Sequence, residues 1–427
     1  MKAARVLAGV AVLLVGAAAL VAYLNQRDEI DVTAPPAAAT RTADLVERGA
    51  YLARAGNCMA CHTARGGAPY AGGRGIETPF GTVYTSNLTP DQATGIGSWT
   101  AAHFWRALHN GRSQDGRLLY PAFPYASYTR VTRADANALF AYLQSLTPVA
   151  QANTAHTLRW PYRTQAALAI WRALYFSPGA HRDDTGQSAV WNRGAYLVRG
   201  LGHCAACHTV RNALGASDDA LDLAGGLIPM QNWYAPSLAS PAQAGVQDWP
   251  TAEIVALLGT GVSPRGSATG PMAEVVLHST QHLRPDDLAA MATYLQALPV
   301  AAGPSRTAKP PPAPAAVAAR GAKLYDQHCE QCHGARGEGV PQAYPPLAGN
   351  RAVSLPSAAN LVQIVLKGGY APATAGNPRP FGMPPYVLLL SDADVAAVLT
   401  HIRASWGNQA PPVTELEVNR LRDSVSR

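Results

Sequence analysis

A five-residue pattern, Cys-x-x-Cys-His, occurs three times in this 427-residue chain and uses all six of its cysteines. The pattern is the attachment signature of c-type haem: two thiols bond to the porphyrin vinyl groups, and the histidine becomes the proximal ligand of the iron. The close spacing lets both sulfurs reach one porphyrin edge while the imidazole turns beneath the iron. We therefore predict three covalent haem c groups, held by Cys58, Cys61 and His62, by Cys204, Cys207 and His208, and by Cys329, Cys332 and His333.

Other uses of paired cysteines fit this pattern less well. A structural zinc site needs cysteines that cluster across the chain, and it leaves the repeated histidine unexplained. A disulfide framework is typical of small cysteine-rich scaffolds, and a thioredoxin-like redox pair has no need of a histidine in all three copies.

Methionine is the usual distal iron ligand in electron-transfer cytochromes, and the chain has six methionines. Met383 lies in a Gly-Met-Pro-Pro loop 50 residues after the histidine of the third motif. Met272 lies in a Gly-Pro-Met-Ala segment 64 residues after the histidine of the second motif. We predict both as distal ligands. Met230 competes with Met272, whereas Met291 lies inside a predicted helix, where a core position explains it more simply.

The first motif has no methionine on its distal side. None occurs between His62 and Pro148, and Met59 is tied between the two cysteines, where it cannot reach the distal face. His103 and His109 are the imidazoles available in this part of the chain, and a surface or propionate-contacting role suits both better than ligation. The distal ligand of haem 1 therefore stays unassigned, with a five-coordinate iron as one possibility.

Similar helical patterns precede and follow each motif. The approach patterns cover residues 44–55, 191–201 and 318–327, and the closing patterns cover residues 134–146, 285–298 and 391–403. Each approach pattern contains a glycine, which would let another helix cross very closely. Two closing patterns end almost alike, in AYLQSL and TYLQAL. We interpret this as an internal repeat with one haem-binding unit per copy.

Composition places the boundaries between these units. Alanine, proline and threonine dominate residues 31–42, and prolines dominate residues 309–314, as is typical of tethers and linkers. A helical stripe of Val418, Leu421 and Val425 predicts that the tail caps the third domain. The predicted order is an anchor or signal (1–30), a tether (31–42), domain 1 (43–150), a connector (151–185), domain 2 (186–303), a Pro-rich linker (304–317), domain 3 (318–410) and a C-terminal tail (411–427).

The N-terminal segment predicts a single membrane anchor. Residues 6–24 form an uncharged apolar run. Its length is close to that needed to span a bilayer and exceeds the core of most signal peptides. Lys2 and Arg5 precede the apolar run, so the positive-inside rule puts the N-terminus in the cytoplasm. We expect a single-pass anchor in the inner membrane with the remaining chain in the periplasm. A signal cleaved near residues 17–19 is the alternative.

Composition excludes other classes of function. Charged residues make up 14% of the chain, and the formal net charge is only +7, without a dense basic run. We therefore expect no nucleic-acid partner. We also find no catalytic triad, paired-carboxylate site, phosphate-binding loop or nicotinamide-binding fingerprint, and predict no catalytic residues.

The order of approach helix, motif, loops and closing helix resembles the cytochrome c fold. We expect a mainly α fold: three tandem cytochrome c domains with long loops, preceded by one transmembrane helix. Residues 44–422 resemble the three-haem cytochrome c subunits of membrane-bound bacterial dehydrogenases for alcohols, aldehydes, gluconate and sugars, and of molybdenum hydroxylases. The segments that carry the resemblance are 48–53 (RGAYLA), 77–82 (ETPFGT), 119–125 (LYPAFPY), 191–197 (WNRGAYL), 202–204 (GHC), 270–276 (GPMAEVV), 344–350 (YPPLAGN) and 406–408 (WGN).

The resemblance implies the same attachment, proximal and distal residues that the motifs predict, including Met272 and Met383. Many relatives have a methionine in the segment that matches residues 128–132, where this chain has Val131, which leaves the distal ligand of haem 1 open. Within this family, residues 129–135 of this chain (TRVTRAD) look more like the same segment of the cytochrome subunits that partner molybdenum hydroxylases.

The function that the resemblance implies is electron transfer. The partner would be a dehydrogenase catalytic subunit of molybdopterin, PQQ or FAD type, in some cases with a small iron–sulfur subunit, and the acceptor would be ubiquinone or a terminal oxidase. Two alternatives stay open: a stand-alone membrane-anchored carrier or oxidase subunit, and a haem enzyme or sensor that uses an open position on haem 1.

Overall fold

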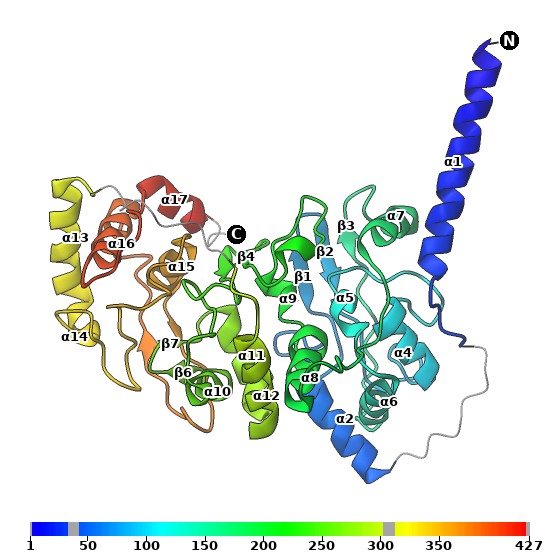
Figure 1. The fold of residues 1–427 in the computed structure, drawn as a ribbon, viewed down its shortest axis with the longest axis horizontal. Helices are drawn as coiled ribbons and strands as arrows, with labels where there is room; N and C mark the ends of the chain where they lie inside the picture. The colour runs from blue at the N-terminus through cyan, green and yellow to red at the C-terminus, as the bar shows by residue number, and fades with distance from the viewer. Residues whose placement is uncertain (1, 33–41, 302–311, 424–427) are drawn as a thin grey trace. The chain divides into compact units, whose positions relative to one another are not determined.

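The structure, a computed structural model, describes residues 2–32, 42–301 and 312–423 (Figure 1). Most of the tether and much of the Pro-rich linker that the composition predicts lie outside these residues. The described chain is mainly helical with short antiparallel hairpins, which confirms the predicted fold class. It divides into two compact units. One contains the described residues up to 183 together with 199–203 and 212–217, and the other contains the remaining described residues from 184 onward.

The first unit begins with the apolar helix α1 and continues with the first motif. Helix α2 packs against α6, and a small antiparallel sheet in the order β1-β2-β3 follows the motif. Its elements are α1 (Lys2–Gln26), α2 (Ala43–Ala55), α3 (Cys58–Cys61), β1 (Gly75–Thr78), β2 (Gly81–Tyr84), α4 (Ala101–Asn110), α5 (Tyr125–Tyr128), α6 (Arg133–Leu143), β3 (Thr157–Leu158) and α7 (Gln165–Tyr175).

The second unit contains the other two motifs. Its elements are α8 (Ala189–Tyr196), α9 (Ala205–His208), β4 (Gly226–Ile228), β5 (Trp233–Ala235), α10 (Thr251–Thr260), β6 (Val262–Ser263), β7 (Gly266–Ser267), α11 (Pro271–His278), α12 (Pro285–Gln296), α13 (Ala315–His328), α14 (Glu330–His333), α15 (Ala359–Lys367), β8 (Gly369–Tyr370), β9 (Gly382–Met383), α16 (Asp392–Ala404) and α17 (Glu415–Asp423). Short 3-10 turns cover Asp219–Leu221 and Thr280–His282, and a π-helical turn, Leu197–Leu201, extends α8.

Each approach helix crosses its closing helix at a glycine, as the sequence predicts. The crossings join α2 to α6, α8 to α12 and α13 to α16. A Cβ atom on any of the three glycines would overlap a backbone carbonyl of the closing helix. The pairs are Gly49 with Ala138, Gly194 with Ala290, and Gly321 with Ala397. Only glycine therefore permits these helix axes to approach so closely.

An ion pair that the sequence patterns above did not predict accompanies each crossing. The arginine directly before each glycine binds an aspartate in the first turn of the closing helix. The pairs are Arg48–Asp135 at 2.5 Å, Arg193–Asp287 at 2.8 Å and Arg320–Asp394 at 2.7 Å. The side chains of Asp135 and Asp287 are only 3% and 6% exposed, so loss of either arginine would leave a buried charge without this partner. The Arg-Gly dipeptide that recurs in the three approach helices is the sequence pattern that could have indicated these pairs.

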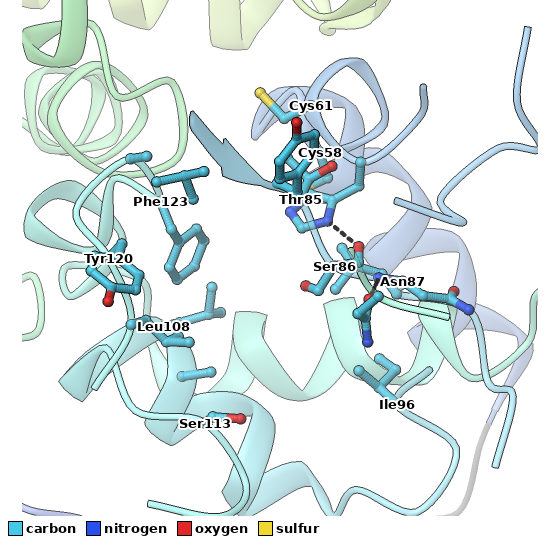
Figure 2. A pocket seen from close by; sticks show the side chains of 18 of the residues that line it. Cys58, Cys61, Thr85, Ser86, Asn87, Ile96, Leu108, Ser113, Tyr120 and Phe123 are labelled. Carbon is cyan, nitrogen blue, oxygen red and sulfur yellow. Dashed lines mark hydrogen bonds between the residues drawn. The ribbon is translucent and has the colours of Figure 1, made fainter. Parts of the chain in front are cut away.

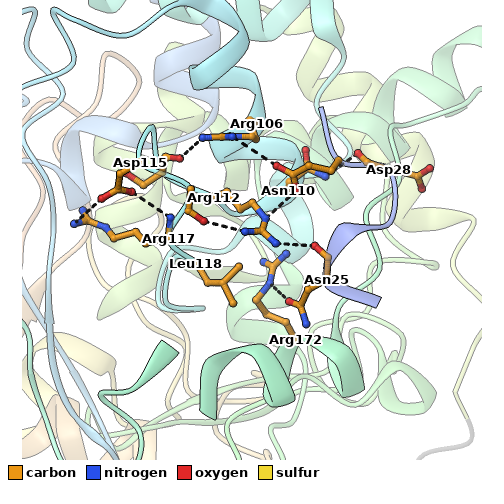
Figure 3. Close-up of polar contacts among 12 residues, drawn as sticks. Asn25, Asp28, Arg106, Asn110, Arg112, Asp115, Arg117, Leu118 and Arg172 are labelled. Carbon is orange, nitrogen blue, oxygen red and sulfur yellow. Dashed lines mark hydrogen bonds and ion pairs between the residues drawn. The ribbon is translucent and has the colours of Figure 1, made fainter. Parts of the chain in front are cut away.

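The last turn of α1 is part of the first unit (Figure 3). Asn25 is 8% exposed; its side-chain amide donates to Ala169 O at 2.9 Å, and its Oδ1 accepts from Arg172 Nε at 3.0 Å. Arg112 donates to Asn25 O at 2.9 Å and pairs with Glu29 at 2.8 Å. These contacts attach the end of α1 to α7 and to the loop after α4.

The C-terminal tail caps the third domain, as its helical stripe predicts. Helix α17 contacts α15 and α16. Val418 is fully buried in the core of this domain, and Leu421 packs against the same core. Val425, the third predicted member of the stripe, lies outside the described residues.

We expect Gly194→Ala to lower the free energy of unfolding by about 1–3 kcal/mol, because the new methyl group must push α8 away from α12. Gly266→Ala is the control, since a Cβ at Gly266 meets nothing within 4 Å. Denaturant unfolding of the two variants measures the difference. Equal losses of stability would contradict the close crossing.

Candidate haem-binding sites

Each motif folds as one helical turn directly after its approach helix. In all three copies the N–H of the histidine donates to the carbonyl of the first cysteine at 2.9 Å. Positions i, i+3 and i+4 of such a turn share one face, so the two thiols and the imidazole lie together. No disulfide joins any of the six cysteines, all of which lie in the described part of the chain.

Each motif histidine is oriented by a backbone carbonyl. The Nδ1–H groups of His62, His208 and His333 donate to Ser86 O at 2.7 Å, Pro236 O at 2.7 Å and Pro345 O at 3.0 Å. A carbonyl can only accept, so this bond fixes the tautomer and leaves Nε2 as a lone-pair donor. Burial lowers the pKa of all three imidazoles, and the carbonyl only partly offsets this effect. The imidazoles are therefore neutral at pH 7, as iron ligation requires.

A glycine behind each motif holds the histidine backbone. The N–H groups of Gly72, Gly225 and Gly339 donate to the carbonyls of the three histidines at 2.8, 2.7 and 2.8 Å. All three glycines have positive φ, at +77°, +85° and +66°, and a Cβ on any of them would meet neighbouring backbone. The sequence indicates only a turn at Gly72. Its bond to His62 gives it a role in the site.

The first unit contains a cavity beside the first motif (Figure 2). Its volume is about 560 Å³, and its lining includes Cys58, Cys61 and His62. Leu108 and Leu139 are among the many apolar side chains on its walls. An apolar cavity with two thiols and one neutral imidazole on its wall fits a porphyrin attached through thioether bonds.

The third domain brings Met383 to the core that also contacts its motif. Both Met383 and Cys329 pack against this core. Strand β9, which contains Met383, pairs with β8. Gly368 lies so close to Met383 O that a side chain at Gly368 would clash. Met383 stays the predicted distal ligand of haem 3.

The second domain places Met272 at the start of α11. Gly270, which precedes the helix, has no side chain, and this leaves room for the ring of Trp233 in β5. That strand leads directly to Pro236, whose carbonyl orients His208. The competing residues have other positions: Met230 is 54% exposed and Met291 is in the core. Met272 stays the predicted distal ligand of haem 2.

The two imidazoles considered for haem 1 do not line the cavity. His103 caps its own helix, and the Nδ1–H of His109 donates to Thr129 O at 2.9 Å. Two other histidines, His156 and His203, do line it. Val131, which the resemblance left as an open question for the distal ligand, is fully buried.

Comparison with known proteins agrees with this geometry. The sequence model of the Cytochrome c family matches residues 46–147, 192–299 and 318–406, one match around each motif. The chain is also similar to the cytochrome c subunit of a quinone alcohol dehydrogenase from Gluconacetobacter polyoxogenes, with 40% identity over 89% of this chain and 84% of the relative.

Two further relatives belong to other dehydrogenases. The gluconate 2-dehydrogenase cytochrome c subunit of Pantoea cypripedii is 40% identical over 88% of this chain and 89% of the relative. A nicotinate dehydrogenase subunit of Pseudomonas putida is 39% identical over 94% of this chain, which spans 34% of that longer protein.

We expect Gly72→Ala to reduce the free energy of unfolding more than Gly66→Ala. Both glycines have φ near +70°, so both variants pay about 1–2 kcal/mol for a left-handed alanine. Only a Cβ at Gly72 also meets backbone, at Ser86 and Asn87, whereas Gly66 has open space. Denaturant unfolding with haem absorbance as the probe measures both costs. Equal costs would mean that Gly72 does not hold the His62 loop.

Proposed function

The chain belongs to the cytochrome c family, as the electron-transfer subunit of a dehydrogenase complex, and from this premise we propose that it carries three covalent haems c and delivers electrons to ubiquinone or a terminal oxidase. The observation that carries the proposal is the threefold repetition of one site. Each copy has two thiols and a histidine on one turn, a carbonyl on Nδ1 and a glycine N–H on the histidine carbonyl.

The residues of the chain hold and tune each haem, which supplies one-electron chemistry at its iron when bound. The cysteines attach it: Cys58 and Cys61, Cys204 and Cys207, Cys329 and Cys332. Proximal ligation falls to His62, His208 and His333, and distal ligation at haems 2 and 3 falls to Met272 and Met383. The carbonyl on each Nδ1 keeps the imidazole in one orientation. Fixed ligands minimise rearrangement when the iron changes charge.

Methionine raises the potential of a haem, so its loss should lower the potential. For Met383→Leu we expect a high-spin haem and a potential lower by on the order of 0.1 V, within the roughly 0.8 V range that axial ligands span. Met272→Leu should act in the same way on haem 2. Met230→Leu is the control, because this side chain is exposed. Spectroelectrochemical titration measures the three potentials. Unchanged potentials in both test variants would contradict the assigned ligands.

The partner of this chain is a dehydrogenase catalytic subunit of molybdopterin, PQQ or FAD type, with a small iron–sulfur subunit where the catalytic subunit needs one. The names of the relatives support such a partner, since they include subunits of alcohol, gluconate and nicotinate dehydrogenases.

Helix α1 suggests a membrane anchor, because it is long and apolar enough to span a bilayer. Lys2 and Arg5 support a cytoplasmic N-terminus in the inner membrane, with the haem domains in the periplasm. Helix α7, which contacts α1, also exposes apolar side chains: Ile170 is 52% and Leu174 is 65% exposed. Apolar side chains beside an anchor helix suit a position at the membrane surface.

Purification from native membranes in mild detergent tests the proposed complex. We expect three covalent haems per chain in a haemochrome assay and a large molybdopterin, quinoprotein or flavoprotein subunit in the same fraction. The control replaces residues 1–22 with a cleavable secretion signal, which keeps the contacts of Asn25 and Glu29, and should shift most of the chain to the soluble periplasmic fraction. A chain that purifies alone would contradict the dehydrogenase partner, and fewer than three haems would contradict the assigned cofactors.

A further inference from the structure

The first domain has Phe123 close to the position at which the third domain has Met383. Phe123 precedes Asp135 by 12 positions, and Met383 precedes Asp394 by 11. The two aspartates are equivalent, since each pairs with the arginine of its approach helix at the helix crossing. Both Phe123 and Met383 are followed by proline. Counted from this aspartate, Phe123 lies within one position of the predicted iron ligand of the third domain, whereas Met272 of the second domain lies 15 positions before Asp287.

The structure places Phe123 in the wall of the cavity that contains the first motif. Figure 2 shows its ring across the cavity from Cys58 and Ser86. The ring packs on Tyr128, with 5.3 Å between centroids, and the Tyr128 hydroxyl donates to Gly56 O at 2.7 Å. Phe123 is therefore held against the cavity by its neighbours. A phenyl ring has no lone pair to offer to iron.

The cavity wall also contains two histidines, His156 and His203. No methionine occurs among the described residues that line it. The Nδ1 of His156 accepts from Tyr84 N at 3.1 Å, two residues before Ser86, whose carbonyl holds the proximal His62. The His156 ring also lies 5.1 Å from that of Tyr120, whose carbonyl accepts from Phe123 N at 3.0 Å, so His156 lies close to the segment that carries Phe123. Because its Nδ1 accepts a hydrogen bond, the proton of the neutral ring is on Nε2, which then has no lone pair to offer to iron.

His203 belongs to the attachment edge of the site. Its ring lies 5.4 Å from that of Tyr128, which binds the carbonyl of Gly56, two residues before Cys58. The Nδ1–H of His203 donates to Leu201 O at 2.9 Å, which further fixes the ring there. This bond holds His203 beside the attachment segment, although its ring and that of Phe123 both pack on Tyr128.

We propose that haem 1 is five-coordinate and that its distal face, beside Phe123, binds a small uncharged diatomic ligand such as carbon monoxide or nitric oxide. This inference rests on the proposed attachment of a haem to the first motif. Leu108, on the same side of the cavity as Phe123 in Figure 2, adds to its apolar lining. An apolar face penalises charged ligands and favours neutral ones, because an ion would lose its hydration there.

Carbon monoxide added to the reduced full-length protein tests the proposal, after a haemochrome assay has established three covalent haems. We expect one carbon monoxide for every three haems, and one high-spin ferric signal in electron paramagnetic resonance. Phe123→Met should abolish both, because it supplies a thioether, and should raise the potential of haem 1. Phe123→Leu is the matched control: it removes the ring, adds no donor and should keep both signals.

The outcomes separate this inference from the proposed function. Fewer than three covalent haems contradicts the proposed cofactors. Three haems that are all low-spin and bind no carbon monoxide contradict only the open site. In that case, a high-spin signal in His156→Ala or His203→Ala would identify the imidazole that binds the iron. Carbon monoxide binding that survives in Phe123→Met would show that position 123 does not face the iron.

Discussion

The close crossing of two helices is the constraint on which each haem site depends. An approach helix that ends in the motif can pass its closing helix only where a glycine removes the side chain, as Gly49, Gly194 and Gly321 do. The arginine beside each glycine binds an aspartate of the closing helix, which fixes the register of the crossing. The crossing thereby sets the direction in which the motif leaves its helix. It also sets the position of the closing helix, and so the point at which the loop before that helix ends.

The proximal half of the site repeats because the backbone builds it. Each histidine is oriented by a carbonyl on Nδ1 and by a glycine N–H on its own carbonyl. Both partners are backbone groups. The only requirement on a side chain is that the glycine has none. Such a site can be copied in tandem while the surrounding sequence diverges. It also keeps the imidazole fixed, which suits a protein whose task is to exchange electrons with little rearrangement.

The predicted distal residues differ in type and setting among the three domains, because each is a single side chain on a separate local element. Domain 3 presents Met383 from a short strand, domain 2 presents Met272 from the first turn of a helix, and domain 1 presents Phe123 from an irregular segment. The helix crossing and the histidine contacts are the same beside all three residues. On the proposed assignments, chemistry at the iron would therefore differ among the domains without a change of architecture.

The sequence by itself determined the mainly helical repeat and the glycine crossings, and it predicted the attachment residues and proximal histidines, because these depend on residue type and local spacing. Tertiary structure decided which residues face a common cavity. Neither His103 nor His109 lines the cavity of the first motif, whereas Phe123 and His156 do. The role of Gly72 and the Arg–Asp pairs also appeared only in the folded chain. These contacts join residues far apart in sequence, and no local periodicity encodes them.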